Sequence, residues 1–315
     1  EKDGRLYRSE LKFESREQLQ NVIQQIVADC NRVVNEASPI VDARLRNGSR
    51  VNIVLDPVAL NGPVVTIRRF PDKPIMMEDL IAFGSVTVEV CAWLQKLVQA
   101  KYNIMISGGT GSGKTTFLNA LSYYIPQEER IITIEDNAEL QILGMPNLVR
   151  MEKRNANVEG CSEITIRDLI KTSLRMRPDR IIVGEVRGGE AFDMMQCLNT
   201  GHDGSMSTGH ANSSKDMLSR LENMILMGME IPLTAIRQQI ASGVDIIVHL
   251  GRLRDRSRKV LEITEVLGFE DDRILLKPLY QFEETGEDAA GRVAGTLRKK
   301  GELTYVEKLQ SAGLR

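Results

Sequence analysis

Apolar and polar residues in the first 70 positions alternate in patterns that predict a helix followed by three strands. Ser15 and Gln18 form a capping box, and the helix that they open has apolar residues three or four positions apart. Apolar and polar residues then alternate on both sides of Asn47-Gly48, which is typical of a β-hairpin, and a further strand runs over 64–67. The pattern therefore predicts a small α+β domain over residues 1–70.

A proline-containing segment separates this domain from a longer region with a different pattern. We predict a linker over residues 71–78, beginning at Pro71-Asp72-Lys73-Pro74, because prolines restrict the backbone and end regular structure. Beyond it, short β-branched runs alternate with helical periodicity, which predicts an α/β domain with a parallel sheet over 79–315. The polar segment Glu283–Lys300 is expected to be a mobile excursion. The runs are Ile104–Ser107, Ile131–Ile134, Ile181–Val183 and Ile246–Val248, and the helices are expected near 114–124, 166–176, 189–199 and 214–227.

Composition narrows the classes of function. Lys and Arg number 41 against 43 Asp and Glu, a formal net charge of −2, so the surface as a whole is not built for nucleic acid. Hydrophobic residues make up 42%, which excludes disorder as the main state, and aromatic residues make up 4%, which disfavours base-stacking platforms. No apolar run reaches the about 18 residues that a membrane-spanning helix needs. The chain begins at Glu1 without a Met, so we expect its native N-terminus to be missing.

The four cysteines favour neither a zinc site nor a disulfide framework. Cys30, Cys91, Cys161 and Cys197 lie far apart in the sequence, and none of them forms a CxxC pair. We therefore expect reduced and mostly buried thiols.

The most specific motif is a glycine-rich loop between a predicted strand and a predicted helix. Residues Gly108–Thr115 fit G-x-x-x-x-G-K-[ST]. Glycines let successive backbone N–H groups point at phosphate oxygens, Lys114 would bridge the β- and γ-phosphates, and the Thr115 hydroxyl would hold Mg²⁺. The motif predicts a site for ATP and Mg²⁺. Its phosphate-binding residues are Gly109, Thr110, Gly111, Ser112, Gly113, Lys114, Thr115 and Thr116.

A P-loop enzyme also needs a carboxylate near the phosphates, for Mg²⁺ or for the attacking water. Glu185 follows the run Ile181–Val183, which is the Walker B position, and Glu135 follows Ile131–Ile134. The carboxyl ends of parallel strands are where α/β sheets bind ligands. Either acid alone could cap a helix or lie in solvent, but the P-loop makes two such bystanders improbable.

Histidines and arginines supply further candidates. His202 and His210 lie in the polar, glycine-flanked segment 201–212, which suits a sensor of the γ-phosphate or of an adjoining subunit, although a structural role for each remains open. No third ligand is evident, which disfavours a metal site, and His249 is expected to be structural. Most arginines are solvated or paired locally, but a guanidinium aimed at the γ-phosphate accelerates hydrolysis. The grouped arginines are Arg68, Arg69, Arg150, Arg154, Arg167, Arg175, Arg177 and Arg187.

Taken in order, these motifs resemble those of the ATPases of type II and type IV secretion systems. Those ATPases share a Walker A motif, an Asp box, a Walker B motif and a His box, which correspond to Gly108–Thr116, Ile134–Leu140, Leu174–Gly188 and residues 201–212. The sequence of Leu174–Gly188 is most similar to that of the CpaF-like ATPases of Tad/Flp pili. The resemblance covers about residues 1–270, and it implies a RecA-like P-loop core with a smaller N-terminal α+β domain.

The resemblance also implies catalytic roles. Glu135 in the Asp box would activate water, Glu185 would be the Walker B acid that holds Mg²⁺, directly or through water, and His210 would be the phosphate-linked residue of the His box. The four-cysteine metal module of type II relatives is absent from the sequence, so zinc is not expected.

Four arginines carry further expectations from the same resemblance. Arg68 and Arg69 match positions from which the N-terminal domain reaches the nucleotide, and we expect Arg150 and Arg167 to reach a phosphate across a subunit interface. The family implies a hexamer on the cytoplasmic face of the inner membrane, where it would move platform proteins that assemble pilin fibres. We also expect nucleotide binding to close the two domains about a hinge at Pro71–Pro74.

The expected function is therefore a hexameric motor ATPase that powers assembly, and possibly retraction, of a Tad/Flp type IV pilus. A type IV secretion or conjugation ATPase is the nearest alternative because it shares the motifs. A nucleic-acid translocase is disfavoured by the sparse aromatic residues and the net charge. A scaffold that binds ATP without hydrolysing it is disfavoured by the two acids at strand ends.

Overall fold

The computed structural model describes residues 6–71, 73–154, 162–289 and 291–314. The chain divides into two compact units, Glu1–Lys73 and Pro74–Arg315. Asp72 of the predicted linker and the predicted thiol Cys161 lie outside the described residues. Of the other cysteines, Cys91 and Cys197 are buried thiols and Cys30 is a partly exposed one.

The smaller unit has the predicted helix and three antiparallel strands. It consists of α1 (Arg16–Asp29), β1 (Ile40–Arg44), β2 (Arg50–Val54) and β3 (Val64–Arg68), with the strands in the order β1-β2-β3. The Ser15 hydroxyl caps α1 by accepting the backbone N–H of Gln18. The apolar face of α1 packs on the sheet, because Ile23 and Val27 share one buried cluster with Val51 and Ile53.

The centre of the larger unit is a parallel sheet of β-branched strands. In the described residues it consists of β4 (Ile104–Gly108), β5 (Ile131–Glu135), β6 (Leu148–Glu152), β7 (Arg180–Val183), β8 (Met206–His210) and β9 (Ile246–Arg252). Their order is β9-β4-β8-β7-β5-β6, with every neighbouring pair parallel. The strands β4, β5 and β7 are buried along their whole length, which fits their continuous apolar runs.

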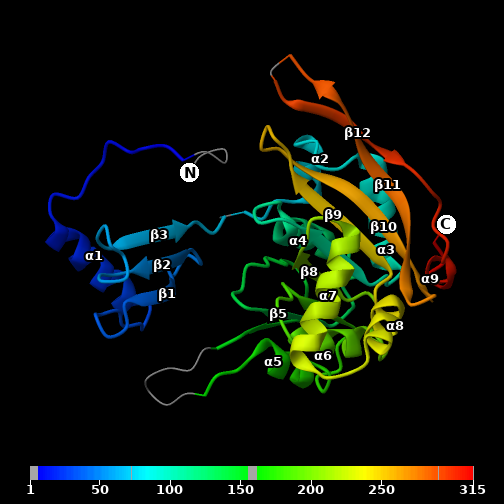
Figure 1. Ribbon diagram of the computed structural model, residues 1–315, viewed down its shortest axis with the longest axis horizontal. Coiled ribbons are helices and arrows are strands. Elements are labelled where there is room, and N and C mark those ends of the chain that lie inside the picture. Colours follow the sequence, from blue (N-terminus) through cyan, green and yellow to red (C-terminus); the bar gives the residue numbers. More distant parts are fainter. Residues whose placement is uncertain (1–5, 72, 155–161, 290, 315) are drawn as a thin grey trace. The chain divides into compact units, whose positions relative to one another are not determined.

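Helices cover both faces of these strands (Figure 1). They are α2 (Met77–Ala82), α3 (Val88–Gln99), α4 (Lys114–Ser122), α5 (Ile166–Ser173), α6 (Glu190–Leu198), α7 (Ser214–Gly228) and α8 (Leu233–Gly243). Side chains alternate along a strand, so Ile104 and Ile106 of β4 enter one apolar core, with Phe117 of α4, while Met105 enters the other, with Leu221 of α7. The predicted α/β fold with a smaller α+β domain is therefore confirmed.

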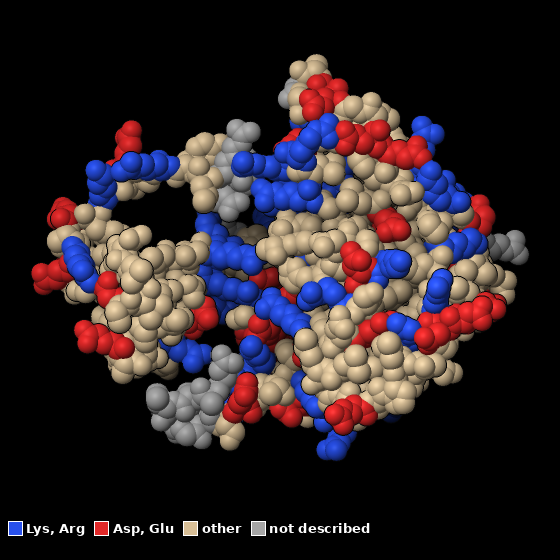
Figure 2. Space-filling view, in the orientation of Figure 1, with Lys and Arg blue, Asp and Glu red and all other residues tan. Residues whose placement is uncertain are grey.

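The mobile excursion predicted for Glu283–Lys300 was wrong. The described part of this segment lies in β11 (Arg273–Glu287) and β12 (Val293–Lys299), which together with β10 (Arg258–Glu270) extend the sheet beyond β9 in antiparallel fashion. Its charges are paired: Arg254 bonds Glu284 at 2.6 Å, and Lys300 bonds Glu283 at 2.5 Å. Acidic and basic side chains accordingly lie side by side over this extension (Figure 2).

Two further contacts fasten the parts of the larger unit together. Trp93 of α3 packs against Tyr280 of β11, with ring centroids 5.3 Å apart and planes inclined by 56°. Arg180, at the start of β7, is fully buried and makes a two-pronged ion pair with Glu129, at 2.6 and 2.8 Å. The chain then ends in a short helix, α9 (Glu307–Ser311). Within the described ranges, the helices are too short or too polar to cross a bilayer.

Candidate active site

The glycine-rich loop joins β4 to α4 in the middle of the sheet, as its sequence predicts. Three of its glycines, Gly108, Gly111 and Gly113, have positive φ angles of 157°, 72° and 95°. A Cβ on Gly108 would lie 2.4 Å from the carbonyl oxygen of Leu250 in the adjacent strand and 2.5 Å from Ser112 Oγ. Glycine is therefore required here both for the turn and for the close approach of β9.

The loop lysine reaches across the strand ends to the last residue of β8. Lys114 Nζ donates to the Gly109 carbonyl at 3.1 Å and lies 3.3 Å from Nδ1 of His210. The other ring nitrogen of His210, Nε2, lies 2.7 Å from Glu185 Oε1. Lys114, His210 and Glu185 therefore form one row of close polar contacts that joins the Walker A, His box and Walker B segments.

Burial shifts the pKa of both basic groups in this row downward. It lowers the pKa of Lys114, an effect that the Glu185 carboxylate opposes. Burial also lowers the pKa of His210, and Glu185 again opposes the shift. A neutral imidazole fits this arrangement, because Nδ1 can accept from the ammonium group while Nε2 lies beside the carboxylate. Arg187, which follows on the same loop, pairs with the second oxygen of Glu185 at 2.5 Å.

Glu135 lies at the end of β5, next to β7, and only 2% of it is exposed. Its Oε2 accepts the backbone N–H groups of Glu139 and Leu140 at 2.6 and 2.9 Å, while Oε1 has no hydrogen-bond partner in the part of the chain that the structure describes. Burial raises the pKa of Glu135, although these two N–H groups and Arg150 lower it in part. A Cβ at Gly184 would come within 3.0 Å of Glu135 Cγ, so Gly184 makes room for this side chain.

The predicted arginines lie in three different places. Arg150 Nη2 donates to the Leu140 carbonyl at 2.8 Å and so holds the segment that surrounds Glu135. Arg167 of α5 pairs at 2.7 Å with Asp193 of α6, outside the row described above. Arg68 ends β3 in the smaller unit and Arg69 follows it. Contacts of Arg68, Arg69, Arg150 and Arg167 with a nucleotide stay predictions.

The two histidines of segment 201–212 lie at opposite ends of β8. His210 ends the strand beside Lys114, whereas His202 precedes it, with its backbone carbonyl accepting the Ser205 hydroxyl at 2.7 Å. Strands β4 and β8 are parallel, so the P-loop and His210 both lie at the carboxyl ends of these strands. His202 lies at the amino end of β8, away from the P-loop. His249 is buried in β9, as expected of a structural residue.

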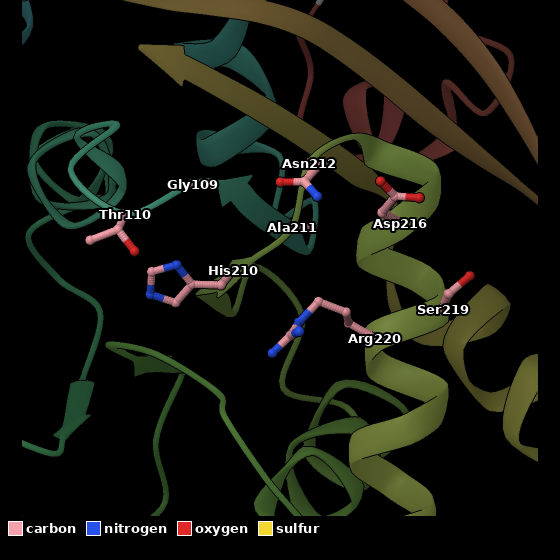
Figure 3. Close-up of a pocket in the computed structure, with 8 residues that line it drawn as sticks. All are labelled: Gly109, Thr110, His210, Ala211, Asn212, Asp216, Ser219 and Arg220. Atoms are coloured by element: carbon pink, nitrogen blue, oxygen red, sulfur yellow. The ribbon is translucent and has the colours of Figure 1, made fainter.

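A cavity of about 570 Å³ opens beside the P-loop. Part of its lining was predicted, namely Gly109 and Thr110 of the loop and His210 of β8. Ala211 and Asn212, which follow β8, also belong to the predicted segment 201–212, whereas the lining from the exposed face of α7 was missed (Figure 3). The only signal in the sequence is the helical spacing of the polar residues after the His box, which is also typical of an ordinary solvated face. The missed residues are Asp216, Ser219 and Arg220.

A second missed residue contacts the loop from its other side. Arg258, the first residue of β10, donates from Nε to the Gly111 carbonyl at 2.8 Å. Its Cδ would lie 3.5 Å from a Cβ on Gly113. The antiparallel extension therefore contacts the phosphate loop directly, a contact that sequence spacing gives no reason to expect.

Comparison with known proteins places these motifs in a family. The sequence profile described as "Type II/IV secretion system protein" matches residues 1–296. A putative conjugal transfer protein of Mycobacterium tuberculosis is 34% identical over 94% of this chain and 85% of its own length. The conjugal transfer protein TrbB of Rhizobium radiobacter is 32% identical over 79% of this chain and 75% of its own length.

Solved structures agree with this placement. The VirB11 ATPase of the Brucella suis type IV secretion system, solved in complex with sulphate, is 30% identical, covers 79% of this chain and 83% of its own, and has a TM-score of 0.51. The pilus retraction motor PilT with bound ADP is 18% identical, covers 84% of this chain and 69% of its own, and has a TM-score of 0.52, a likeness of fold alone. The chain therefore belongs to the type II/IV secretion system protein family, and it is an ATPase of that family.

Proposed function

We propose that this ATPase is the motor of a conjugation-type type IV secretion system. The observation that carries the catalytic part of the proposal is the row Lys114–His210–Glu185, which links the phosphate loop to the Walker B acid through a neutral imidazole. The conjugal transfer proteins and the VirB11 ATPase support the system, since their matches span most of the chain. These relatives favour conjugation-type secretion over the pilus assembly that the sequence motifs suggested.

In the proposed reaction each carboxylate has a separate task. Lys114 would leave the Gly109 carbonyl to neutralise the β- and γ-phosphates, and the N–H groups of the loop would hold the same oxygens. Glu135 is the proposed base, because its Oε1 has no partner among the described residues and burial favours its taking up a proton. When the γ-phosphate is lost, the contacts of Lys114 would change, and His210 would transmit that change to Glu185.

The donor set fits Mg²⁺ bound together with ATP. Among the described residues, His, Cys, Asp and Glu side chains do not gather in the groups of three or more that hold a metal by themselves. Mg²⁺ at a phosphate site usually takes about one or two protein oxygens, and water and phosphate oxygens complete its shell. Thr115 and Glu185 supply a hydroxyl and a carboxylate of this kind. The metal would supply charge that polarises the transferred phosphoryl group.

We further propose that the chain acts as a homohexamer at the inner face of the cell membrane, where it engages platform proteins of the inner membrane. Arg150 and Arg167 are the proposed arginines that complete a neighbour's site, and Arg68 and Arg69 are proposed to bind the nucleotide from the smaller unit. Arg150 and Arg167 would have to exchange their present partners, Leu140 and Asp193, for a phosphate. Nucleic acid is not an expected partner.

A second candidate is the assembly of a Tad/Flp pilus. It is favoured by one observation, the similarity of the sequence Leu174–Gly188, around the Walker B acid, to CpaF-like ATPases. In the source cells, a chain with Glu185→Gln should abolish DNA or effector transfer if the first proposal holds. Loss of pilus fibres with transfer intact would instead favour the second candidate.

The first test is Mg-ATP hydrolysis per chain over a range of protein concentrations. We expect a rate that rises with concentration because neighbours complete the sites, and sizing of the same samples should show the rate following the oligomer. Glu185→Gln and Glu135→Gln should each lower the rate at least about a hundredfold, a barrier increase of about 2.7 kcal/mol, while ATP binding persists. Glu128→Gln, an exposed acid that follows α4, is the matched control.

Three results would count against the proposal. A rate no higher than that of Lys114→Ala would favour an ATP-binding scaffold. Hydrolysis stimulated strongly by DNA would favour a translocase. A full rate in samples that sizing shows to be monomeric would exclude sites completed by a neighbour.

A further inference from the structure

The cavity beside the P-loop is lined by a cation that has no partner in the described part of the chain. Arg220 of α7 lines the cavity, and its side chain extends toward His210 (Figure 3). Asp216 lies one turn earlier on the same helix, the spacing at which acid–base pairs form, yet Arg220 has no hydrogen-bond or ion-pair partner within the described residues. A guanidinium that neither pairs with its helical neighbour nor packs away is available for an anion that enters the cavity.

The position of the cavity identifies which end of the nucleotide it adjoins. Its P-loop lining is Gly109 and Thr110, whose end of the loop the Lys114 ammonium also contacts, and His210 is shared between the cavity and the row. Because Lys114 of a P-loop binds between the β- and γ-phosphates, the cavity adjoins the terminal phosphate.

The size and chemistry of the cavity fit a small hydrated anion. Its volume of about 570 Å³ exceeds by far the about 30 Å³ that one water occupies. The charged or titratable groups that face it are Arg220, Asp216 and His210, with Lys114 behind the imidazole. Asn212 and Ser219 add neutral hydrogen-bonding groups to the lining. The Arg220 cation can attract a phosphate. The Asp216 carboxylate reduces the positive potential of the site, so the bound phosphate can leave again.

We propose that this cavity receives the inorganic phosphate cleaved from ATP and that Arg220 binds it before it leaves. The inference rests on the proposed function. In the preceding step the oxygen of water forms a bond to the γ-phosphorus, the bond from that phosphorus to the oxygen of ADP breaks, and the proton of the water is taken up by Glu135. The phosphate then moves past His210 to Arg220. Arg220 is a product-binding residue in this account, and it takes no part in bond cleavage.

The test is inhibition of ATP hydrolysis by inorganic phosphate, measured on the full chain together with single-turnover cleavage and phosphate release. In the unaltered chain, release should lag behind cleavage and added phosphate should inhibit. Arg220→Gln should raise the inhibition constant for phosphate about tenfold or more, the effect of losing a hydrogen bond to a charged group, and should shorten the lag. Arg220→Lys should retain part of the inhibition, since the charge remains.

Lys215→Gln is the matched control, because it removes an exposed cation from the same helix outside the cavity lining, and its inhibition constant should not change. An Arg220→Gln chain whose cleavage slows while its phosphate inhibition is unaltered would overturn the inference. Inhibition absent from an unaltered chain that hydrolyses ATP would also overturn it. An unaltered chain that does not hydrolyse ATP would be a failure of the proposed function itself, which the Lys114→Ala blank identifies.

Discussion

Directly behind the phosphate loop, a buried histidine fastens the strand that leads into it. Ser107 Oγ, one residue before Gly108, lies 2.6 Å from Nδ1 of His249 in the neighbouring strand β9. Glu262, opposite His249 on β10, accepts the hydroxyl of Ser214 at the start of α7. Two hydrogen bonds therefore lie on neighbouring strands, one at the base of the P-loop and one at the start of the helix that carries the cavity lining, and the Glu262 carboxylate acts on His249 through its charge.

We predict that stability depends on pH through His249. Burial lowers the pKa of His249 from its ordinary value of 6.5, in spite of the nearby acids Glu262 and Asp216. As pH falls below that value, the unfolded chain takes up a proton that the folded chain does not, so stability is fully present above pH 6.5 and decreases below it. Urea unfolding followed by circular dichroism at pH 7.5, 6.0 and 5.0 should show this decrease.

His249→Gln should weaken the same pH dependence. The variant should also lose about 1–3 kcal/mol of unfolding free energy at pH 7.5, because Ser107 loses a buried hydrogen bond. Equal slopes against pH in the two proteins would show that other groups cause the dependence.

Single residues differ in how far the sequence reveals them. The loop from Gly109 to Thr116 could be predicted because its spacing is set by the phosphate chemistry, and Glu135 and Glu185 because each follows an apolar strand. Arg220 and Arg258 could not be predicted. They come near the loop only through the packing of α7 and the pairing of β10, and an exposed arginine in the sequence carries no sign of either.

At the scale of elements, residues 301–314 form a C-terminal strap that a buried acid, Glu265, and a half-buried acid, Asp245, hold against the sheet. The Glu265 carboxylate of β10 accepts the backbone N–H groups of Thr304 and Tyr305 at 2.8–2.9 Å. Lys308 of α9 donates to Asp245, just before β9, at 2.7 Å. The strap therefore supplies the backbone donors of the buried Glu265 carboxylate, and it adds a cation to Asp245, which also accepts the backbone N–H of Asn103 at 2.7 Å.

Lys308→Met should destabilise the protein by about 1–3 kcal/mol, because the Asp245 carboxylate loses its cation. Lys299→Met is the control: both Lys299 and its partner Glu302 are exposed, and an exposed pair contributes about 0–1 kcal/mol. Thermal or urea unfolding of both variants at one pH measures the difference. Equal losses in the two variants would mean that the Asp245 contact adds nothing beyond a surface pair.

The parallel strands and their helices were predictable, whereas the antiparallel extension was not. A short β-branched run such as Ile131–Ile134 has the composition of a strand buried on both faces. In β11 and β12 the strands are half exposed, and charged residues such as Glu283, Glu284 and Arg298 occupy the outer positions. Ion-pair partners, here Lys300 and Arg254, make those charges compatible with a sheet, and a partner distant in sequence cannot be read from the local pattern.

At the scale of the whole molecule, the two units differ in how directly the structure supports their role. The larger unit contains the P-loop, the row Lys114–His210–Glu185 and the cavity, which all lie at the carboxyl ends of strands of one sheet. The smaller unit is a separate compact body, and its proposed contribution to the site rests on Arg68 and Arg69. The match of the family profile to residues 1–296 shows that both units belong to the same family architecture.

Replacing both Arg68 and Arg69 by Ala should weaken binding of a non-hydrolysable ATP analogue at least about tenfold, because two charge-assisted contacts are lost. Isothermal titration calorimetry of the full chain with Mg²⁺ measures this. Arg32→Ala, an exposed arginine of the same unit, should bind as the unaltered chain does. Unchanged affinity in the double variant would restrict nucleotide binding to the larger unit.

The contact between Trp93 and Tyr280 has a practical consequence. Trp93 is the only tryptophan of the chain, and it lies where α3 meets β11. Its emission spectrum therefore probes the packing of α3 against the antiparallel extension, and it does not report directly on melting of the smaller unit. A heating curve recorded by tryptophan emission alone would describe a single unit, and any second transition would have to be sought by a probe of the backbone.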